Sequence, residues 1–124
     1  MTVAEAPCVL VVEDEIMISM LLEDRLEHAG YRVLLAANVK DALELARHAA
    51  LDVAVLDVNL DGATSFPVAE ALRQRGIAFT FASGYGISGV PPEYRGDNML
   101  QKPYDARALL GTLSRLRGLV VGDS

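Results

Sequence analysis

The chain has 124 residues, of which 52% are hydrophobic and 23% are charged, proportions typical of one globular domain rather than of a disordered segment. The net charge of −6 at pH 7 and the pI near 4.8 argue against nucleic acid as a direct partner, because an acidic domain repels phosphate backbones. The single cysteine, Cys8, cannot form an internal disulfide, and no signal peptide or membrane-spanning run is visible. We therefore expect a cytoplasmic protein that does not enter membranes.

The first half of the chain alternates short apolar runs with amphipathic segments. Residues 8–12, Cys-Val-Leu-Val-Val, are a continuous apolar run that is typical of a strand buried on both faces. Residues 15–29 then repeat apolar side chains at helical spacing, and Gly30 ends this predicted helix. A second strand is predicted over residues 31–36, and Asn38 is expected to cap the helix that follows it.

The alternation continues with a third strand over residues 53–58, and with a helix that Thr64 or Ser65 is expected to cap and Gly76 to end. Strands are then predicted over residues 77–82 and 99–101, followed by a final helix capped by Asp105. Between these two strands, residues 84–98 contain four glycines and two prolines, which oppose a long helix. We expect a short or mobile fourth helix there, with one turn beginning at the two prolines.

Strands that alternate with helices indicate a parallel sheet covered on both faces, and such sheets bind ligands beyond the carboxyl ends of their strands. Three acids, a hydroxyl and a lysine fall at these ends: Glu13, Asp14, Asp57, Ser83 and Lys102. Alone, each also fits a helix cap, a loop hydroxyl or a solvated lysine. Asp57 is harder to explain in this way, because a carboxylate in an apolar strand needs a cation or a raised pKa.

Together these residues favour phosphoryl transfer onto a carboxylate. Asp14 and Asp57 are oxygen ligands of the kind that Mg²⁺ prefers, and Asp57 is a candidate nucleophile because carboxylates form aspartyl-phosphates. Lys102 and the metal would spread the charge of the transferring group, and the Ser83 hydroxyl would donate to a phosphate oxygen.

The segments VLVVEDE, DVAVLDVNLDG, FASG and QKPY, in this order and spacing, resemble the motifs of the receiver domain of two-component response regulators. The resemblance covers roughly residues 7–118. It implies an α/β fold of the flavodoxin-like type, a doubly wound five-stranded parallel sheet with strand order 2-1-3-4-5. It also implies a phosphorylation-dependent signalling switch, in which Asp57 accepts a phosphoryl group from a phosphohistidine on a sensor histidine kinase.

The resemblance also implies a metal site. Asp14 and Asp57 would bind Mg²⁺ directly, the backbone carbonyl of Asn59 would be a third ligand, and Glu13 would assist through water. Mn²⁺ or Ca²⁺ are expected substitutes for Mg²⁺. The protein would not be an enzyme acting on a separate substrate, although slow self-catalysed phosphotransfer and dephosphorylation are expected.

The resemblance further implies that the Lys102 ammonium pairs with the phosphoryl group and that Ser83 moves toward this group. It also implies a cis peptide bond from Lys102 to Pro103. Typical receivers carry an aromatic three residues before this lysine, where this chain has Met99, and its aromatic is Tyr85 in the loop instead. This pattern is similar to an atypical subgroup named for a Phe-Ala-Thr-Gly-x-Tyr motif, although serine replaces threonine and the tyrosine comes one residue early. Such receivers often partner HWE-type kinases. Either Tyr85 takes the role of the missing ring, or this receiver signals without one.

We interpret residues 1–124 as a single receiver domain with a core over about 7–118, stand-alone because only GLVVGDS follows the last helix. Phosphorylation is expected to draw in Ser83 and to order residues 84–97. The output would be binding to a partner protein, a phosphate sink, or relay to a histidine phosphotransfer protein, from a monomer or weak dimer. His28 and His48 lie off the apolar helix faces and are expected to be solvated.

Three rival interpretations fit the sequence less well. A pseudo-receiver that only binds proteins would have no need for Asp14, Asp57 and Lys102 together. A haloacid-dehalogenase-like phosphohydrolase needs an acid two residues after its nucleophile, where this chain has Asn59. A nucleotide- or flavin-binding domain would follow its first strand with a glycine-rich phosphate loop rather than with EDEIM.

Overall fold

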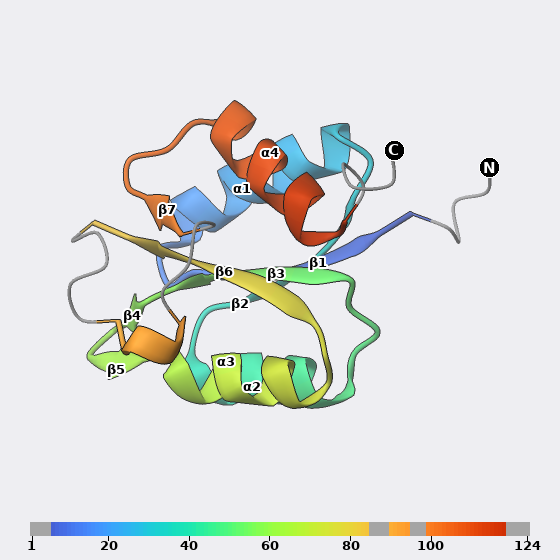
Figure 1. The fold of residues 1–124 in the computed structure, drawn as a ribbon. Coiled ribbons are helices and arrows are strands. Elements are labelled where there is room, and N and C mark those ends of the chain that lie inside the picture. The colour runs from blue at the N-terminus through green and yellow to red at the C-terminus, as the bar shows by residue number, and fades with distance from the viewer. Residues whose placement is uncertain (1–5, 85–89, 95–98, 119–124) are drawn as a thin grey trace.

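The structure is a computed structural model, and it describes residues 6–84, 90–94 and 99–118. Its centre is a five-stranded parallel sheet in the order β2-β1-β3-β6-β7 (Figure 1). The strands are β1 (Cys8–Val12), β2 (Arg32–Ala36), β3 (Val53–Asp57), β6 (Ala78–Ser83) and β7 (Leu100–Gln101). By rank along the chain this order is 2-1-3-4-5, so the predicted flavodoxin-like topology is confirmed.

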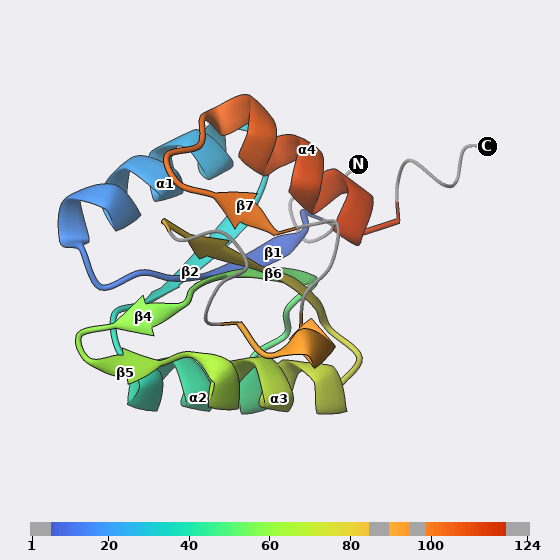
Figure 2. The ribbon, with the colours of Figure 1, turned by 60° about the vertical axis from the view of Figure 1, so that its left-hand side comes forward.

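Two helices cover each face of the sheet. Helices α1 (Ile16–His28) and α4 (Ala106–Leu116) lie above it in Figure 1, and α2 (Val39–His48) and α3 (Phe66–Gln74) lie below it, as the turned view in Figure 2 also shows. The core is accordingly split by the sheet into two apolar clusters, one on each face. Strand β1 is apolar throughout, and β3 is apolar up to its last residue, Asp57, because both faces of these strands are covered.

Two of the three predicted helix caps form as expected. Asn38 accepts a hydrogen bond from the Asp41 N–H at 2.8 Å, and Asp105 accepts one from the Ala108 N–H at 2.8 Å. Ser65 precedes α3, but its ψ of 10° is not the extended conformation of a capping residue, and its side chain makes no cap hydrogen bond. Its hydroxyl is buried and has no hydrogen-bond partner among the described residues.

A small antiparallel hairpin, not predicted from the sequence, follows β3. Its strands are β4 (Asn59–Leu60) and β5 (Ala63–Thr64). Asp61 and Gly62, at the turn between them, have φ values of 49° and 88°. Two consecutive positive φ values define a type I′ turn, for which Asp-Gly is a favoured sequence. The turn holds the backbone at Asn59, two residues after the end of β3, in a fixed conformation.

The connection between β6 and β7 contains a 3₁₀ helix, Pro92–Tyr94, where the sequence predicted a single turn. Tyr85 and most of the predicted switch segment lie outside the described residues. His28 and His48 are solvated as predicted, with side chains that are 78% and 69% exposed. Among the described residues, no helix has both the length and the apolar character needed to cross a membrane.

Candidate functional site

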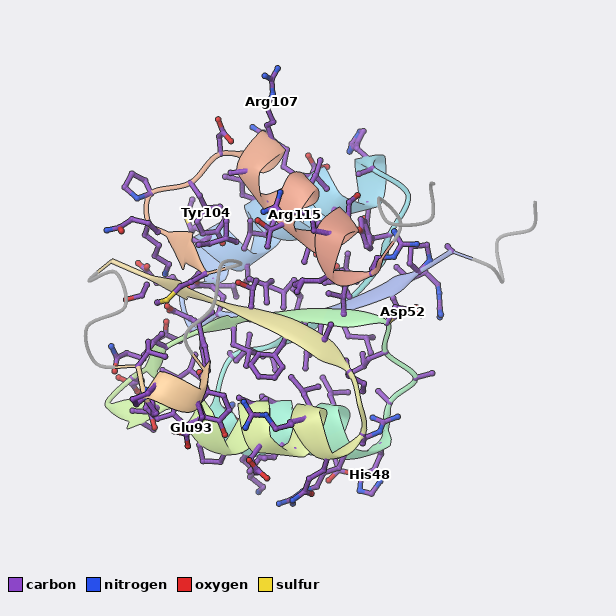
Figure 3. The ribbon with its side chains drawn as sticks, viewed as in Figure 1. His48, Asp52, Glu93, Tyr104, Arg107 and Arg115 are labelled. Carbon is purple, nitrogen blue, oxygen red and sulfur yellow. The ribbon has the colours of Figure 1, made fainter. Side chains whose placement is uncertain are left out.

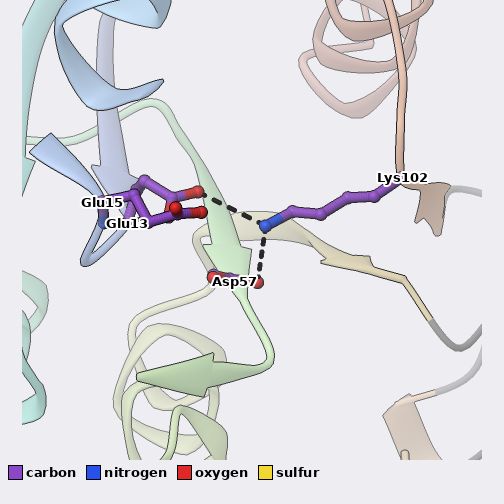
Figure 4. A network of polar contacts seen from close by, with 4 residues as sticks. All are labelled: Glu13, Glu15, Asp57 and Lys102. Atoms are coloured by element: carbon purple, nitrogen blue, oxygen red, sulfur yellow. Dashed lines mark hydrogen bonds and ion pairs between the residues drawn. The ribbon is translucent and has the colours of Figure 1, made fainter. Parts of the chain in front are cut away.

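Acidic side chains and a lysine meet at the carboxyl edge of the sheet. Glu13 and Asp14 follow β1, Asp57 is the last residue of β3, and Lys102 follows β7. Because the strands are parallel, all of these residues emerge at the same edge. Figure 4 shows the Lys102 side chain reaching across this edge to Glu13 and Asp57.

Three carboxylates form a candidate metal centre at this edge. Glu13, Asp14 and Asp57 each offer one oxygen, and these oxygens lie within 4.8 Å of one another. Glu13 is 3% exposed, and Asp14 and Asp57 are half-buried. Like charges so close together are mutually repulsive and partly desolvated, which is unfavourable unless a cation joins them.

Lys102 supplies one such cation. Its Nζ lies 3.1 Å from Asp57 Oδ1 and 3.5 Å from Glu13 Oε1. Partial burial lowers the pKa of Lys102, but the hydrogen bond and the charge of Asp57, with the charge of Glu13, outweigh it and raise the pKa above its ordinary value. The ammonium is therefore charged at neutral pH and shared between two carboxylates from two different strands.

The acids remain costly to ionise even with this lysine present. Burial raises the pKa of Asp57, and the charge of Asp14 adds to the effect, against the hydrogen bond and charge of Lys102. Burial also raises the pKa of Glu13, although the Glu15 N–H donates to Glu13 Oε2 at 3.1 Å. The site therefore has an excess of buried negative charge that one ammonium does not balance.

Ser83 lies on the same edge, at the end of β6. It is 4% exposed, and it follows Ala82, the cross-strand partner of Asp57. Its carbonyl accepts a hydrogen bond from the Lys102 N–H at 2.8 Å, and the peptide bond from Lys102 to Pro103 is cis. The end of β6 is thus hydrogen-bonded to the backbone of Lys102, whose side chain pairs with Asp57.

Asn59 begins the β4–β5 hairpin, where hydrogen-bonded and non-hydrogen-bonded pairs alternate. The Val58 carbonyl accepts from the Ser65 N–H at 3.0 Å, so the neighbouring pair of Asn59 and Thr64 is the non-hydrogen-bonded one. The Asn59 carbonyl is therefore directed away from the partner strand of the hairpin. The Asp-Gly turn was the signal in the sequence that indicated this arrangement.

The structure thus brings together four of the predicted residues, Glu13, Asp14, Asp57 and Lys102, with Ser83 beside them. Met99 is not among them, since it packs against the apolar cluster on the α2 and α3 side of the sheet. Glu13 also contacts Lys102 directly, which was not predicted from the sequence. Its place at the end of β1, the neighbour of β3, was the available signal.

The sheet order, with acids and a lysine on the carboxyl edge, defines an α/β domain of the flavodoxin-like fold, and a CheY-like receiver domain protein from Methanospirillum hungatei JF-1 is a structural neighbour. The family model for the response regulator receiver domain matches residues 9–114, and the chain belongs to this family. It is therefore a receiver domain of two-component signalling.

Individual relatives agree with this assignment. SdrG from Sphingomonas melonis Fr1 is 38% identical, with a TM-score of 0.78 over 94% of this chain and 98% of that one. The receiver domain of the sensor histidine kinase PA1611 from Pseudomonas aeruginosa PAO1, which has a magnesium ion in its active site cleft, is 22% identical with a TM-score of 0.80, covering 91% and 98% of the two chains. The transcriptional regulatory protein YrkP of Bacillus subtilis is 39% identical over 105 residues, which are 82% of this chain and 45% of YrkP. The chain spans about half the length or less of the curated relatives it matches.

Proposed function

We propose that this receiver domain is a phosphorylation-dependent switch in which Asp57 accepts a phosphoryl group from a phosphohistidine on a sensor histidine kinase. The observation that carries the proposal is the position of the Asp57 carboxylate, 3.1 Å from the Lys102 ammonium and within a cluster of three acids. This arrangement offers a nucleophilic oxygen, a cation for the transferring group, and ligands for a second cation.

The oxygen-rich cluster fits Mg²⁺, which takes oxygen ligands in octahedral geometry and keeps some of its waters. Asp14 and Asp57 would bind it directly, together with the Asn59 carbonyl, and Glu13 would act through water. Mn²⁺ and Ca²⁺ take the same ligand types. When bound, the metal would neutralise charge on the phosphoryl oxygens and on the carboxylates.

In the proposed transfer, an Asp57 carboxylate oxygen attacks phosphorus, and the bond from phosphorus to the histidine nitrogen breaks. The electron pair of that bond leaves with the imidazole, and Asp57 becomes an acyl phosphate. Lys102 would move its ammonium from the carboxylate to a phosphoryl oxygen, and the Ser83 hydroxyl would donate to another. Water would later cleave the acyl phosphate slowly, so the protein would act as a phosphoacceptor rather than as an enzyme with a separate substrate.

The remaining parts of the proposal concern partners. Partnership with an HWE-type kinase and membership of the receiver subgroup with the Phe-Ala-Thr-Gly-x-Tyr motif remain predictions. Both rest on the motif around Ser83 and on Met99. Output through a protein target, relay to a histidine phosphotransfer protein, or storage of phosphate would follow from the same acyl phosphate. A donor charged from ATP would place the exchange in the cytoplasm, and the acidic chain would not bind nucleic acid.

The rival proposal is a pseudo-receiver that only binds proteins. Burial of acids at this edge disfavours it, because desolvation raises the pKa of both Glu13 and Asp57 and lowers stability when they are charged. A domain that needed only a protein-binding surface would gain nothing from that cost. A phosphohydrolase of the haloacid-dehalogenase type is disfavoured by Asn59, since its side chain cannot protonate a leaving group.

Incubation with acetyl phosphate and Mg²⁺ tests the proposal. The intact mass should increase by one phosphoryl group, and borohydride reduction followed by peptide mapping should locate the modification at Asp57. EDTA in place of Mg²⁺ should prevent the increase. Uptake at another residue, or none from either acetyl phosphate or a charged kinase, would favour the pseudo-receiver.

Asp14→Asn is expected to remove most of the stabilisation by Mg²⁺ and to make the metal-free protein more stable. Mg²⁺ at about a hundred times its dissociation constant should stabilise the wild type by about 2.7 kcal/mol. The variant lacks one ligand, so its gain should fall below about 1 kcal/mol. Without metal, removal of one of three clustered charges relieves repulsion.

Thermal unfolding with Mg²⁺ and with EDTA measures both effects. Glu15→Gln is the matched control, because Glu15 is exposed beside the cluster but is not one of its three acids. Equal Mg²⁺ stabilisation of Asp14→Asn and wild type would show that the metal binds elsewhere.

A further inference from the structure

A cluster of four aromatic rings lies where the β6–β7 connection meets α3. Tyr94, at the end of the 3₁₀ helix, stacks on Phe66 of α3 at a centroid distance of 6.1 Å and an interplanar angle of 20°. It also makes edge contacts with two rings of β6, Phe79 at 6.0 Å and Phe81 at 5.7 Å. Tyr94 is thus the ring that joins the connection to both a helix and a strand.

Polar contacts fix the same residue to α3. The Arg73 guanidinium carbon lies 4.5 Å from the centroid of the Tyr94 ring, and Arg73 Nη2 donates to the Glu93 carbonyl at 2.8 Å. The Tyr94 hydroxyl donates to Glu70 Oε1 at 3.1 Å. Figure 3 shows Glu93 beside α3, across the sheet from Tyr104. We call these ring, cation and hydrogen-bond contacts the Tyr94 anchor.

Strand β6 links the Tyr94 anchor to the phosphoacceptor site. Phe81 and Ser83 are two residues apart on this strand, so their side chains point to the same face of the sheet. Ala82, between them, pairs with Asp57, and the Ser83 carbonyl accepts from the Lys102 N–H. One end of β6 therefore touches the site, and the ring two residues earlier touches Tyr94.

Lys102 lies in the position expected when Asp57 is unmodified. Its ammonium lies 3.1 Å from a carboxylate oxygen that loses its charge when it becomes the ester oxygen of an acyl phosphate. Movement of Ser83 toward a phosphoryl group on Asp57 would displace the end of β6. Tyr94 is held to α3 by contacts independent of β6, so its contacts with Phe81 would change when the strand moves.

We propose that the Tyr94 anchor holds the 3₁₀ helix of the β6–β7 connection against α3 in the unphosphorylated protein and is weakened when Asp57 is phosphorylated. The inference rests on the proposed function of Asp57. Contacts that form in only one of two states favour that state, so they oppose a ligand that binds the other state better. The coupling is reciprocal: a ligand that favours the other state weakens these contacts, and loss of the contacts strengthens binding of the ligand. Weakening the anchor therefore raises the affinity of the Asp57 site for a phosphoryl group or its mimic, and Tyr94 acts as a positioning residue for β6.

Titration with beryllofluoride in the presence of Mg²⁺ tests the inference. Tyr94→Leu should bind this phosphoryl mimic about tenfold more tightly than the wild type, because it removes several ring contacts and a cation–π contact. Tyr94→Phe keeps the ring and loses only the bond to Glu70, so its affinity should rise less than about threefold.

Tyr31→Leu is the matched control. Tyr31 also makes a cation–π contact, with the guanidinium carbon of Arg117 5.3 Å from its ring centroid. It packs, however, in the apolar cluster on the α1 and α4 side of the sheet. It precedes β2, at the end of the sheet opposite the site. Its replacement should leave beryllofluoride affinity within about twofold of wild type. In wild-type protein labelled at tyrosine, NMR signals of Tyr94 should shift on binding more than those of Tyr31.

Equal or weaker binding by Tyr94→Leu would overturn the inference, as would an equal gain in Tyr31→Leu, which would indicate general loosening of the fold. Wild-type protein that binds no beryllofluoride would overturn the proposed function and this inference with it. Wild-type binding with an unchanged Tyr94→Leu affinity would overturn the anchor alone.

Discussion

Asp57→Asn is expected to abolish phosphoryl uptake from acetyl phosphate and to raise the stability of the metal-free protein. Uptake requires a carboxylate oxygen as nucleophile, and the amide does not supply one. Stability rises because burial and the charge of Asp14 raise the pKa of Asp57 even against the attraction of Lys102. The folded protein thus disfavours the charged form of this side chain. The gain should be about 1 kcal/mol, or about 4 °C in the unfolding midpoint.

Asp61→Asn is the control for this experiment. Asp61 is a nearby exposed acid in the hairpin turn, where its positive φ of 49° suits asparagine as well as aspartate. This variant should take up phosphate as the wild type does and unfold at about the same temperature. If Asp57→Asn were still phosphorylated, another residue would be the acceptor. If it were less stable than wild type, the pairing with Lys102 would outweigh the cost of burial.

Much of the fold could be predicted from the sequence because its strands are short, apolar and separated by amphipathic segments. The strand order was implied by the resemblance to receivers, and the caps at Asn38 and Asp105 had side chains that suit the role. The cap at Ser65 failed because capping depends on the ψ of the residue as well as on its hydroxyl. The β4–β5 hairpin was missed because its strands are too short to form an alternating pattern.

The site could be predicted as a set of residues but not as a set of contacts. Parallel strands bring their carboxyl ends to one edge, so the acids and Lys102 had to be neighbours. That Lys102 is shared between Asp57 and Glu13 depends on the reach of a flexible side chain, which sequence spacing does not reveal. The Tyr94 anchor was equally hidden, because its rings come from a connection, a strand and a helix that are far apart in the sequence.

Because Lys102 pairs with both Asp57 and Glu13, its loss should affect metal binding and phosphoryl transfer in opposite directions. Lys102→Met removes the cation that would stabilise the transferring group, and loss of one such contact typically slows a reaction by about 10²–10³-fold. It also leaves the Asp57 and Glu13 carboxylates with no ammonium, which should destabilise the metal-free protein by about 1–3 kcal/mol.

The same substitution should strengthen Mg²⁺ binding by about tenfold, because the metal would no longer be repelled by an ammonium at the same carboxylates. Mg²⁺ would then restore much of the lost stability without restoring the rate. Rates of uptake from acetyl phosphate and unfolding midpoints across a Mg²⁺ titration measure the two effects separately.

Lys40→Met, at the other lysine of the chain and exposed on α2, should change neither. If Lys102→Met took up phosphate at the wild-type rate, the charge of the transferring group would have to be stabilised by the metal and the backbone alone. If its Mg²⁺ affinity fell instead, Lys102 would be holding the carboxylates in place for the metal rather than competing with it.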